Sequence, residues 1–331
     1  MNIWRLHLNT DTFDGRTIAD LCLKNNIMAL GWSLRDKDFS TWSESKQAKM
    51  REARAKIRSD DEKQSYKQYE KFIKRWPIYY DGKKVNDNVR TLYEKVEPND
   101  LVWIRHHGIY YLGRVEKESK WEYNGDEEIL ALDAATQRTH VKWHRVGDEA
   151  CVPGKVTTAF IKGKTLQRIL AYEVSIFSQH YYHTQVDSSC YPDVVVEASQ
   201  EAFYDLLSPT DCEDLVCAYL FKKYGYIVIP STNKDSTELY ECVLLNPENR
   251  RHIYIQCKKG NVDIDANNYA HLNGDVFLFT SNGSVQNIES TPDNIKRIMP
   301  EELYKFAMSD EAKNVVSDSV SHWTEYLRKG L

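Results

Sequence analysis

Four polar side chains interrupt or end apolar stretches in the C-terminal part of the chain: Glu213, Glu241, Gln256 and Lys258. An unpaired polar group is costly in an apolar environment, and functional sites are where such departures from the sequence pattern are expected. Carboxylate and amide oxygens suit a hard cation such as Mg²⁺, and an ammonium group offsets the charge of a phosphate. Together these side chains predict metal-dependent hydrolysis of a phosphodiester bond.

Each of the four has an expected role. Glu241 is the main metal carboxylate, Gln256 adds its side-chain oxygen, and Glu213 reaches in as a further ligand or supports the others. Lys258 lies beside the attacking water, where it orients the water and counters the phosphate charge. The cation, Mg²⁺ or Mn²⁺, lowers the pKa of that water and polarises the phosphoryl oxygen. Asp235 and Glu238 are alternative first acids, although either could be only a turn residue.

A helix is expected to carry Glu213. Residues 213–220 have helical spacing, and Gly225 marks the end of the helix. Thr210 or Asp211 is the expected cap, which would put Glu213 in the first turn. An acidic residue there could equally be favoured by the helix dipole alone.

A hairpin is expected to carry the other three side chains. Residues 240–245 and 252–257 are rich in β-branched and aromatic residues, and a polar turn separates them. Side chains alternate between the two faces of a strand. Glu241 therefore shares a face with Val243, and Gln256 shares a face with Lys258. Further strands are expected at 276–280 and 295–299, and helices at 301–308 and 312–327.

This order of elements, with Gln256-x-Lys258 ending the second hairpin strand, resembles the core of the PD-(D/E)xK nuclease superfamily, in particular its Mrr-like restriction branch. The resemblance covers residues 210–282 and implies a restriction-endonuclease-like mixed sheet flanked by helices, within an α/β fold. It implies an Mg²⁺-dependent endodeoxyribonuclease. The chain departs from the family in lacking an Asp-Gly-x-Asp form of the first acid, so Asp235, Glu238 and Glu241 all remain candidates.

The N-terminal half contains a hairpin with a glycine turn at residues 96–115, with further strands at 2–8, 27–34, 139–146 and 165–169. "Pro-x-Asp-Leu-Val-Trp" followed by "Tyr-Tyr-Leu-Gly-Arg-Val" is similar to small α+β barrels of the PUA/EVE-like type, which implies a module that holds RNA or a flipped modified base. Such a module needs aromatic faces for stacking and polar groups at the base edge. The candidates are Trp32, Trp103, Tyr110 and Trp143, with Arg105 and His106 for polar contacts. These aromatic residues could instead fill the barrel.

Two helices are expected in the charged stretch 35–75, at residues 44–56 and 60–76. Tyr66, Tyr69, Phe72 and Ile73 form an apolar stripe on the second helix. Most of the charge in this stretch is expected to lie on a solvated face.

Composition bounds the class of protein. The chain has 331 residues, of which 41% are hydrophobic and 28% charged, as in globular proteins. No apolar stretch approaches the roughly 18–20 residues that span a bilayer, and the N-terminus lacks a signal-peptide pattern. We therefore expect a cytoplasmic protein without a membrane partner. The seven cysteines contain no C-x-x-C pair, so no zinc site is expected.

Charge is divided unevenly along the chain. Residues 201–331 contain 13 Lys and Arg against 20 Asp and Glu, a net charge of −7, whereas the whole chain has −5. A polyanion would then have to be held by the first half or by a partner protomer, and we expect a homo-oligomer.

We therefore predict a sensor domain at residues 1–170, a connector at 171–205 and a nuclease domain at 206–331. The predicted function is cleavage of DNA, possibly modified, in prokaryotic restriction. One alternative is an RNA-directed nuclease. The other is a non-catalytic nucleic-acid-binding protein with a relic nuclease core.

Overall fold

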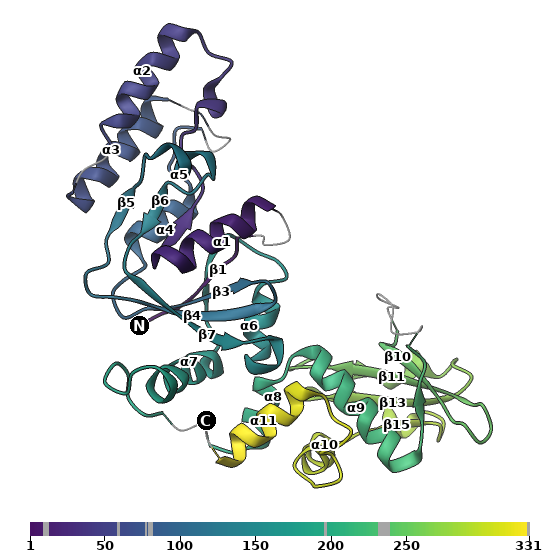
Figure 1. Ribbon diagram of the computed structural model, residues 1–331. Coiled ribbons are helices and arrows are strands. Elements are labelled where there is room, and N and C mark those ends of the chain that lie inside the picture. Colours follow the sequence, from purple (N-terminus) through teal and green to yellow (C-terminus); the bar gives the residue numbers. More distant parts are fainter. Residues whose placement is uncertain are drawn as a thin grey trace. The chain divides into compact units, whose positions relative to one another are not determined.

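The structure of the chain is a computed structural model (Figure 1). It describes residues 1–8, 13–57, 60–76, 78, 82–194, 197–230 and 239–329, without the side chains of residues 13–16. Contacts between residues divide the chain into two compact units, residues 1–149 with 159–171 and residues 150–158 with 172–331. Both units combine helices with sheets, so the predicted α/β class is confirmed.

The first unit contains a five-stranded sheet and a three-stranded sheet. The larger has the order β7-β4-β3-β1-β8 and the smaller β2-β6-β5. Their strands are β1 (Ile3–Leu6), β2 (Met28–Leu30), β3 (Leu101–His106), β4 (Ile109–Val115), β5 (Trp121–Tyr123), β6 (Thr136–Arg138), β7 (Val141–Gly147) and β8 (Leu166–Ile169). The backbone N–H of Val141 donates to the carbonyl of Asn26 at 2.8 Å and joins the two sheets. Neither sheet closes into a barrel within the described residues, so the expected closed barrel is not confirmed.

The helices of this unit are α1 (Phe13–Asn25), η1 (Asp36–Phe39), α2 (Glu44–Ala55), α3 (Glu62–Arg75), α4 (Asp87–Glu94) and α5 (Glu127–Ala131). The predicted apolar stripe of α3 is confirmed, because Tyr66, Tyr69, Phe72 and Ile73 are all buried. Tyr66 packs edge-to-face on Trp121 of β5, with ring centroids 5.2 Å apart. This stripe is what attaches the α2–α3 hairpin to the rest of the unit.

The segment after β2 differs from the predicted strand at 27–34. β2 ends at Leu30, and Trp32 and Leu34 then adopt positive φ angles of 59° and 57°. The left-handed region is costly for residues with a bulky side chain. A reversal of the chain therefore takes the place of the last four residues of the expected strand.

The second unit is built around one mixed sheet with the order β15-β13-β11-β10-β9. Its strands are β9 (Ile227–Val228), β10 (Cys242–Leu245), β11 (His252–Lys258), β13 (Asp275–Thr280) and β15 (Ile295–Arg297), and β12 (Ile264–Asp265) pairs separately with β14 (Val285–Gln286). β10 is antiparallel to β11, whereas β11, β13 and β15 are parallel to one another. The predicted hairpin and the mixed sheet are confirmed.

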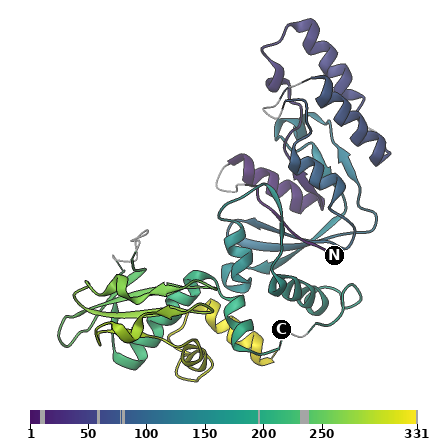
Figure 2. The ribbon, with the colours of Figure 1, turned by 180° about the vertical axis from the view of Figure 1, so that it is seen from behind.

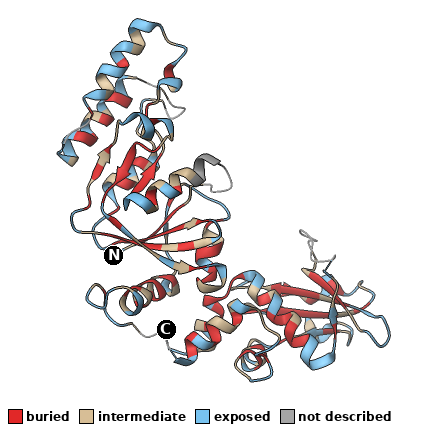
Figure 3. Ribbon diagram, viewed as in Figure 1, coloured by how far each residue is buried: buried red, intermediate tan, exposed pale blue. Residues whose placement is uncertain are grey.

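Helices flank this sheet: α7 (Tyr172–Gln185), α8 (Gln200–Leu206), α9 (Pro209–Tyr224), α10 (Pro300–Ala307) and α11 (Asp318–Lys329). Short turns of 3-10 helix lie at η4 (Ala266–Tyr269) and η5 (Ile288–Ser290), and η2 (Glu149–Cys151) and α6 (Gly154–Ala159) lie near the boundary of the units. α9 runs along the sheet in both views (Figures 1 and 2). The strands are largely buried, whereas α2 of the first unit is largely exposed (Figure 3).

Candidate active site

The start of α9 fixes the position of Glu213. Ser208 is the N-cap, because its hydroxyl accepts from the backbone N–H of Asp211 at 3.1 Å, while the Asp211 carboxylate accepts from the N–H of Ser208 at 2.7 Å. Pro209 follows as the first helical residue, a position that tolerates its missing N–H. The expected cap at Thr210 or Asp211 is thus wrong. Glu213 lies in the second turn of the helix rather than the first.

α9 is held on the sheet by its apolar side. Leu215, Val216 and Leu220 are fully buried, and the Sγ atoms of Cys217 on α9 and Cys242 on β10 lie 3.5 Å apart. Cys242 and its cross-strand partner Ile255 therefore face the helix. Since side chains alternate along a strand, Glu241 and Gln256 face the opposite side of the sheet.

Glu241 lies immediately before β10 rather than inside it. Its backbone N–H still donates to the carbonyl of Ile255 at 2.8 Å, which extends the pairing of the hairpin by one residue. The hairpin therefore brings Glu241 next to Gln256 and Lys258, as the alternation predicts. A Glu at the end of the strand keeps one side open to solvent, and its side chain is 25% exposed.

Three of the predicted side chains are in direct contact. Lys258 Nζ lies 2.7 Å from Glu241 Oε1 and forms an ion pair with it. Gln256 Nε2 donates to the same carboxylate oxygen at 3.3 Å. Gln256 is buried, whereas the side chain of Lys258 is 39% exposed. The buried amide thus holds the carboxylate, and the ammonium group is accessible from solvent.

The fourth side chain is linked to these three by charge. The pKa of Glu213 is raised to about 7, first by burial and then by the nearby charges of Glu241 and Asp214, while Lys258 opposes the shift. Two carboxylates that repel each other favour the protonated form of one of them. This charge interaction is what links Glu213 on α9 to the side chains on the opposite face of the sheet.

Gln256 gives a second indication of a ligand. Its Oε1 atom is buried and has no hydrogen-bond partner among the described residues. A buried acceptor without a partner costs free energy, and an amide oxygen is a ligand for Mg²⁺. The oxygens of Glu241 and Gln256 thus suit the expected cation, and Glu213 is linked to them by charge alone.

A cation site here needs the amide oxygen of Gln256 in addition to carboxylates. In the described part of the chain, no three His, Cys, Asp or Glu side chains gather closely enough to hold a metal ion. The alternative first acids Asp235 and Glu238 lie outside the described residues. Both belong to residues 231–238, which directly precede Leu239 in the sequence, so a further carboxylate from this segment stays a prediction.

Sequence reasoning missed the contacts of two further side chains in the second unit, one near the Glu241 carboxylate and one at the end of α8. Burial and the charge of Glu241 raise the pKa of Tyr269 to about 12, so this buried tyrosine lies near the carboxylate. Lys259 Nζ donates to the carbonyls of Asp205 and Leu207 and ties β11 to the end of α8. Tyr269 could have been singled out in the sequence as the aromatic residue of a polar segment. Lys258 and Lys259 are adjacent lysines, and the sequence alone does not show that they make different contacts.

The six candidates for base binding belong to the first unit. The pairing of β3 with β4 puts Trp103, Arg105 and Tyr110 on one face of the larger sheet. Trp103 and Tyr110 are buried there, and the Tyr110 ring contacts Phe160 with centroids 5.6 Å apart. No ring face of Trp103 is open to a base, since the side chain is 0% exposed.

His106 and Trp143 face the other side of the same sheet. His106 Nε2 contacts Asp20 Oδ1 at 2.8 Å, and Trp143 lies across Gly113, where an added Cβ would meet the indole ring at 2.5 Å. Trp143 also donates from Nε1 to the carbonyl of Ile27 at 3.1 Å. Trp32 is half-buried in the left-handed reversal after β2. The structure thus divides five of the six side chains between two faces of one sheet and puts Trp32 outside it.

Comparisons with models of protein families, with curated proteins and with solved structures found no match for this chain. Among the described helices, none is both long and apolar enough to cross a membrane.

Proposed function

We propose that this chain is a metal-dependent endonuclease of the PD-(D/E)xK superfamily, in its Mrr-like branch, that cleaves phosphodiester bonds in DNA. The observation that carries the proposal is the contact of Glu241 with both Gln256 and Lys258, beside a Glu213 whose pKa is raised to about 7. A helix followed by an antiparallel hairpin and then a parallel strand supports the same assignment.

Three side chains would hold the cation: Glu241, Gln256 through its free Oε1, and Glu213 from α9. When bound, Mg²⁺ or Mn²⁺ supplies a water of lowered pKa and polarises the phosphoryl oxygen. Lys258 offers its ammonium group to the phosphate oxygens, where charge grows in the transition state. Gln256 keeps the Glu241 carboxylate in place through its N–H donor, so the acidic and basic groups stay aligned.

Recognition of a modified base belongs, in this proposal, to the first unit and to Trp32. The reversal around Trp32 is held by the Tyr69 hydroxyl, which donates to the Trp32 carbonyl at 3.0 Å, and by Asp133, which accepts from the N–H of Ser33 at 3.0 Å. Backbone in sparsely populated regions is retained where the surroundings enforce it, and such residues cluster at binding sites. A half-buried indole on such a turn suits stacking with a flipped base in a PUA/EVE-like module. Restriction of modified DNA in prokaryotic defence, by a homo-oligomer in the cytoplasm, is the role that follows.

A cleavage assay tests the proposal. Plain, methylated and hydroxymethylated DNA duplexes are incubated with the full chain in Mg²⁺, in Mn²⁺ and in EDTA, with Lys258→Ala as the inactive control. We expect strand breaks that need the metal and Lys258. Cleavage of RNA alone would favour an RNA-directed nuclease. Intact DNA and RNA under all conditions would leave a non-catalytic protein with a relic nuclease core.

A further inference from the structure

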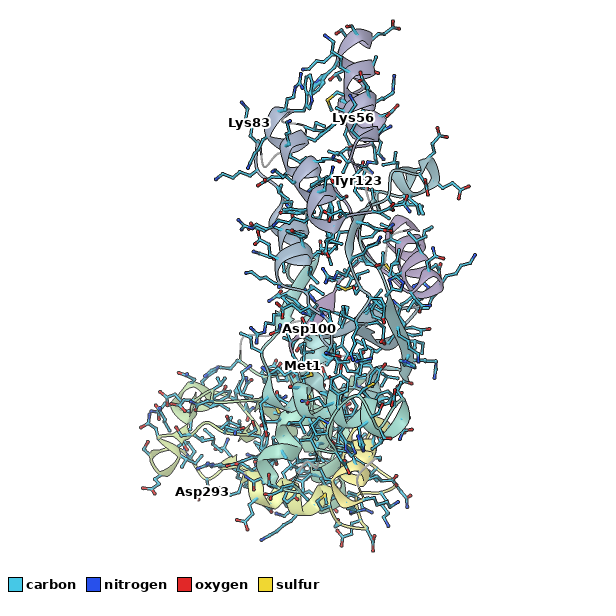
Figure 4. All side chains as sticks on the ribbon, turned by 90° about the vertical axis from the view of Figure 1, so that its left-hand side faces the viewer. Met1, Lys56, Lys83, Asp100, Tyr123 and Asp293 are labelled. Atoms are coloured by element: carbon cyan, nitrogen blue, oxygen red, sulfur yellow. The ribbon has the colours of Figure 1, made fainter. Side chains whose placement is uncertain are left out.

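The α2–α3 hairpin of the first unit is strongly basic. Residues 44–76 contain eleven Lys and Arg against six Asp and Glu, a net charge of +5, in a chain whose total is −5. Side chains of these helices project from the ribbon in Figure 4, where Lys56 is labelled. Solubility alone needs no such separation of charge, whereas a cationic region concentrates a polyanion.

The two helices form a groove of about 410 Å³. Ala53, Phe72 and Trp76 give it an apolar floor, and its charged lining is Lys49, Glu52, Lys56, Lys71 and Arg75. Glu52 is the one acidic residue of the described lining, and it is paired with Lys56 at 2.6 Å. Within the described residues, Lys49, Lys71 and Arg75 have no carboxylate partner. In the part of the chain that the structure describes, three exposed cations thus face a groove whose one carboxylate is already paired.

Two polar atoms of the groove lining also lack partners. Gln68 Oε1 and Trp76 Nε1 are buried and form no hydrogen bond with any described residue. A buried donor and a buried acceptor are normally satisfied. Their position in the same groove as the free cations points to a ligand that carries negative charge and groups able to form hydrogen bonds.

The spacing of the cations favours a chain of phosphates over a single small anion. Lys71 and Arg75 are four residues apart on α3, which corresponds to roughly 6 Å along its axis, and Lys49 faces the same groove from α2. Nucleotides of one DNA strand follow one another at about 3.4 Å along the duplex, so these cations reach more than one phosphate. The unit that contains Glu241 and Lys258 is acidic, so the backbone contacts have to come from elsewhere in the chain.

We infer that the α2–α3 groove binds the phosphate backbone of DNA, with Lys49, Lys71 and Arg75 as its principal contacts. The choice of DNA rests on the proposed nuclease function, whereas the anion-binding character of the groove stands on its own residues. Phosphate contacts position a protein on the duplex and carry no sequence information. The groove would therefore hold DNA of any sequence and leave base recognition to Trp32.

The test is the salt dependence of binding. Affinity of the full chain for a fluorescent 30-base-pair duplex is measured by anisotropy in EDTA over a series of salt concentrations. The combined variant Lys49→Gln, Lys71→Gln, Arg75→Gln should reduce the slope of log K against log [salt] by about 2 to 3, because each lost phosphate contact removes about 0.9. The matched control Lys305→Gln, Lys313→Gln, Lys329→Gln removes the same charge from exposed positions of the second unit and should keep the wild-type slope.

Both variants are first compared with the wild type by circular dichroism and thermal unfolding. An unchanged slope in the folded groove variant overturns the inference, as does equal weakening in the control. Loss of RNA affinity with unchanged DNA affinity also overturns it. If the wild type cleaves no DNA and the groove variant still loses duplex affinity, the nuclease proposal fails and the groove inference stands.

Discussion

Glu213 should make the metal-free protein less stable as the pH rises, and Glu213→Gln should remove this loss. The folded-state pKa of about 7 lies above the ordinary glutamate value of 4.5. The folded protein therefore keeps a proton that the unfolded chain has already released. Stability from this group is complete below pH 4.5 and is lost as the pH rises through 7.

The size of the effect follows from the same two values. A difference between 4.5 and about 7 corresponds to roughly 3 kcal/mol for a group fully shielded from solvent. Glu213 is only half-buried, and solvent screening reduces charge interactions of exposed groups, so about 1 kcal/mol is the expected gain of Glu213→Gln at pH 8. For a unit of this size that is roughly 2–4 °C in melting temperature.

Thermal unfolding in EDTA at pH 5 and pH 8 measures this directly. At pH 5 the wild type and Glu213→Gln should melt at similar temperatures, because the glutamate is protonated. At pH 8 the variant should melt higher. Glu301→Gln is the matched control on α10: the ion pair with Lys305 lowers the pKa of Glu301, so its loss should bring no gain at pH 8.

Addition of Mg²⁺ at pH 8 gives a second readout. A cation that binds only the folded state raises its stability, and it should do so more in the wild type than in Glu213→Gln, which lacks one carboxylate. A variant that is destabilised equally at pH 5 and pH 8, with the same response to Mg²⁺ as the wild type, would refute the reasoning. Glu213 would then be an ordinary helix residue outside the cation site.

Three further predictions concern activity. Lys258→Ala should keep the fold and lower the cleavage rate at least roughly a hundredfold, a typical loss for one group that stabilises transition-state charge; wild-type rates would exclude Lys258 from the site. Glu241→Ala should abolish metal-dependent cleavage in a plasmid-nicking assay, and an active Glu241→Ala with an inactive Asp235→Ala would move the first acid to Asp235. Trp32→Ala should remove discrimination between modified and plain duplexes in competition binding, a stacking loss of about 1–3 kcal/mol, whereas Trp103→Ala should lower the melting temperature, since a buried Trp→Ala change costs about 3–5 kcal/mol.

The mixed sheet of the second unit was largely predictable because its determinants are local. Side chains alternate between the two faces of a strand, so Gln256 and Lys258 lie on one face of β11. The turn between β10 and β11 sets the register of the two strands, and this register brings Glu241 into contact with both. The cap of α9 was misplaced because Ser208, Thr210 and Asp211 all suit an N-cap. Pro209 favours Ser208, because proline is over-represented at the first helical position, directly after the N-cap.

The first unit was harder to predict because its sites depend on contacts between distant segments. Trp103 and Trp143 look alike in the sequence, yet the register of β3, β4 and β7 puts them on opposite faces. The reversal at Trp32 and Leu34 could not be foreseen either. Tyr69 bonds the carbonyl of Trp32, 37 residues away, and Asp133 accepts from the N–H of Ser33, 100 residues away. Local sequence patterns do not predict contacts between residues so far apart.

The charges of the two units suggest why one chain would need both. Glu213, Glu241 and Lys258 sum to −1 when both carboxylates are ionised, and to zero once Glu213 takes up a proton, while Gln256 adds no charge. A site so close to neutrality can be buried without a metal, but it attracts a cation less strongly than a set of three carboxylates would. Under the proposed function, the acidic surroundings of residues 201–331, with a net charge of −7, would help to gather the divalent cation and at the same time repel DNA. The proposed basic groove on the first unit would resolve that conflict, because it would hold the polyanion through contacts that the cation site cannot provide.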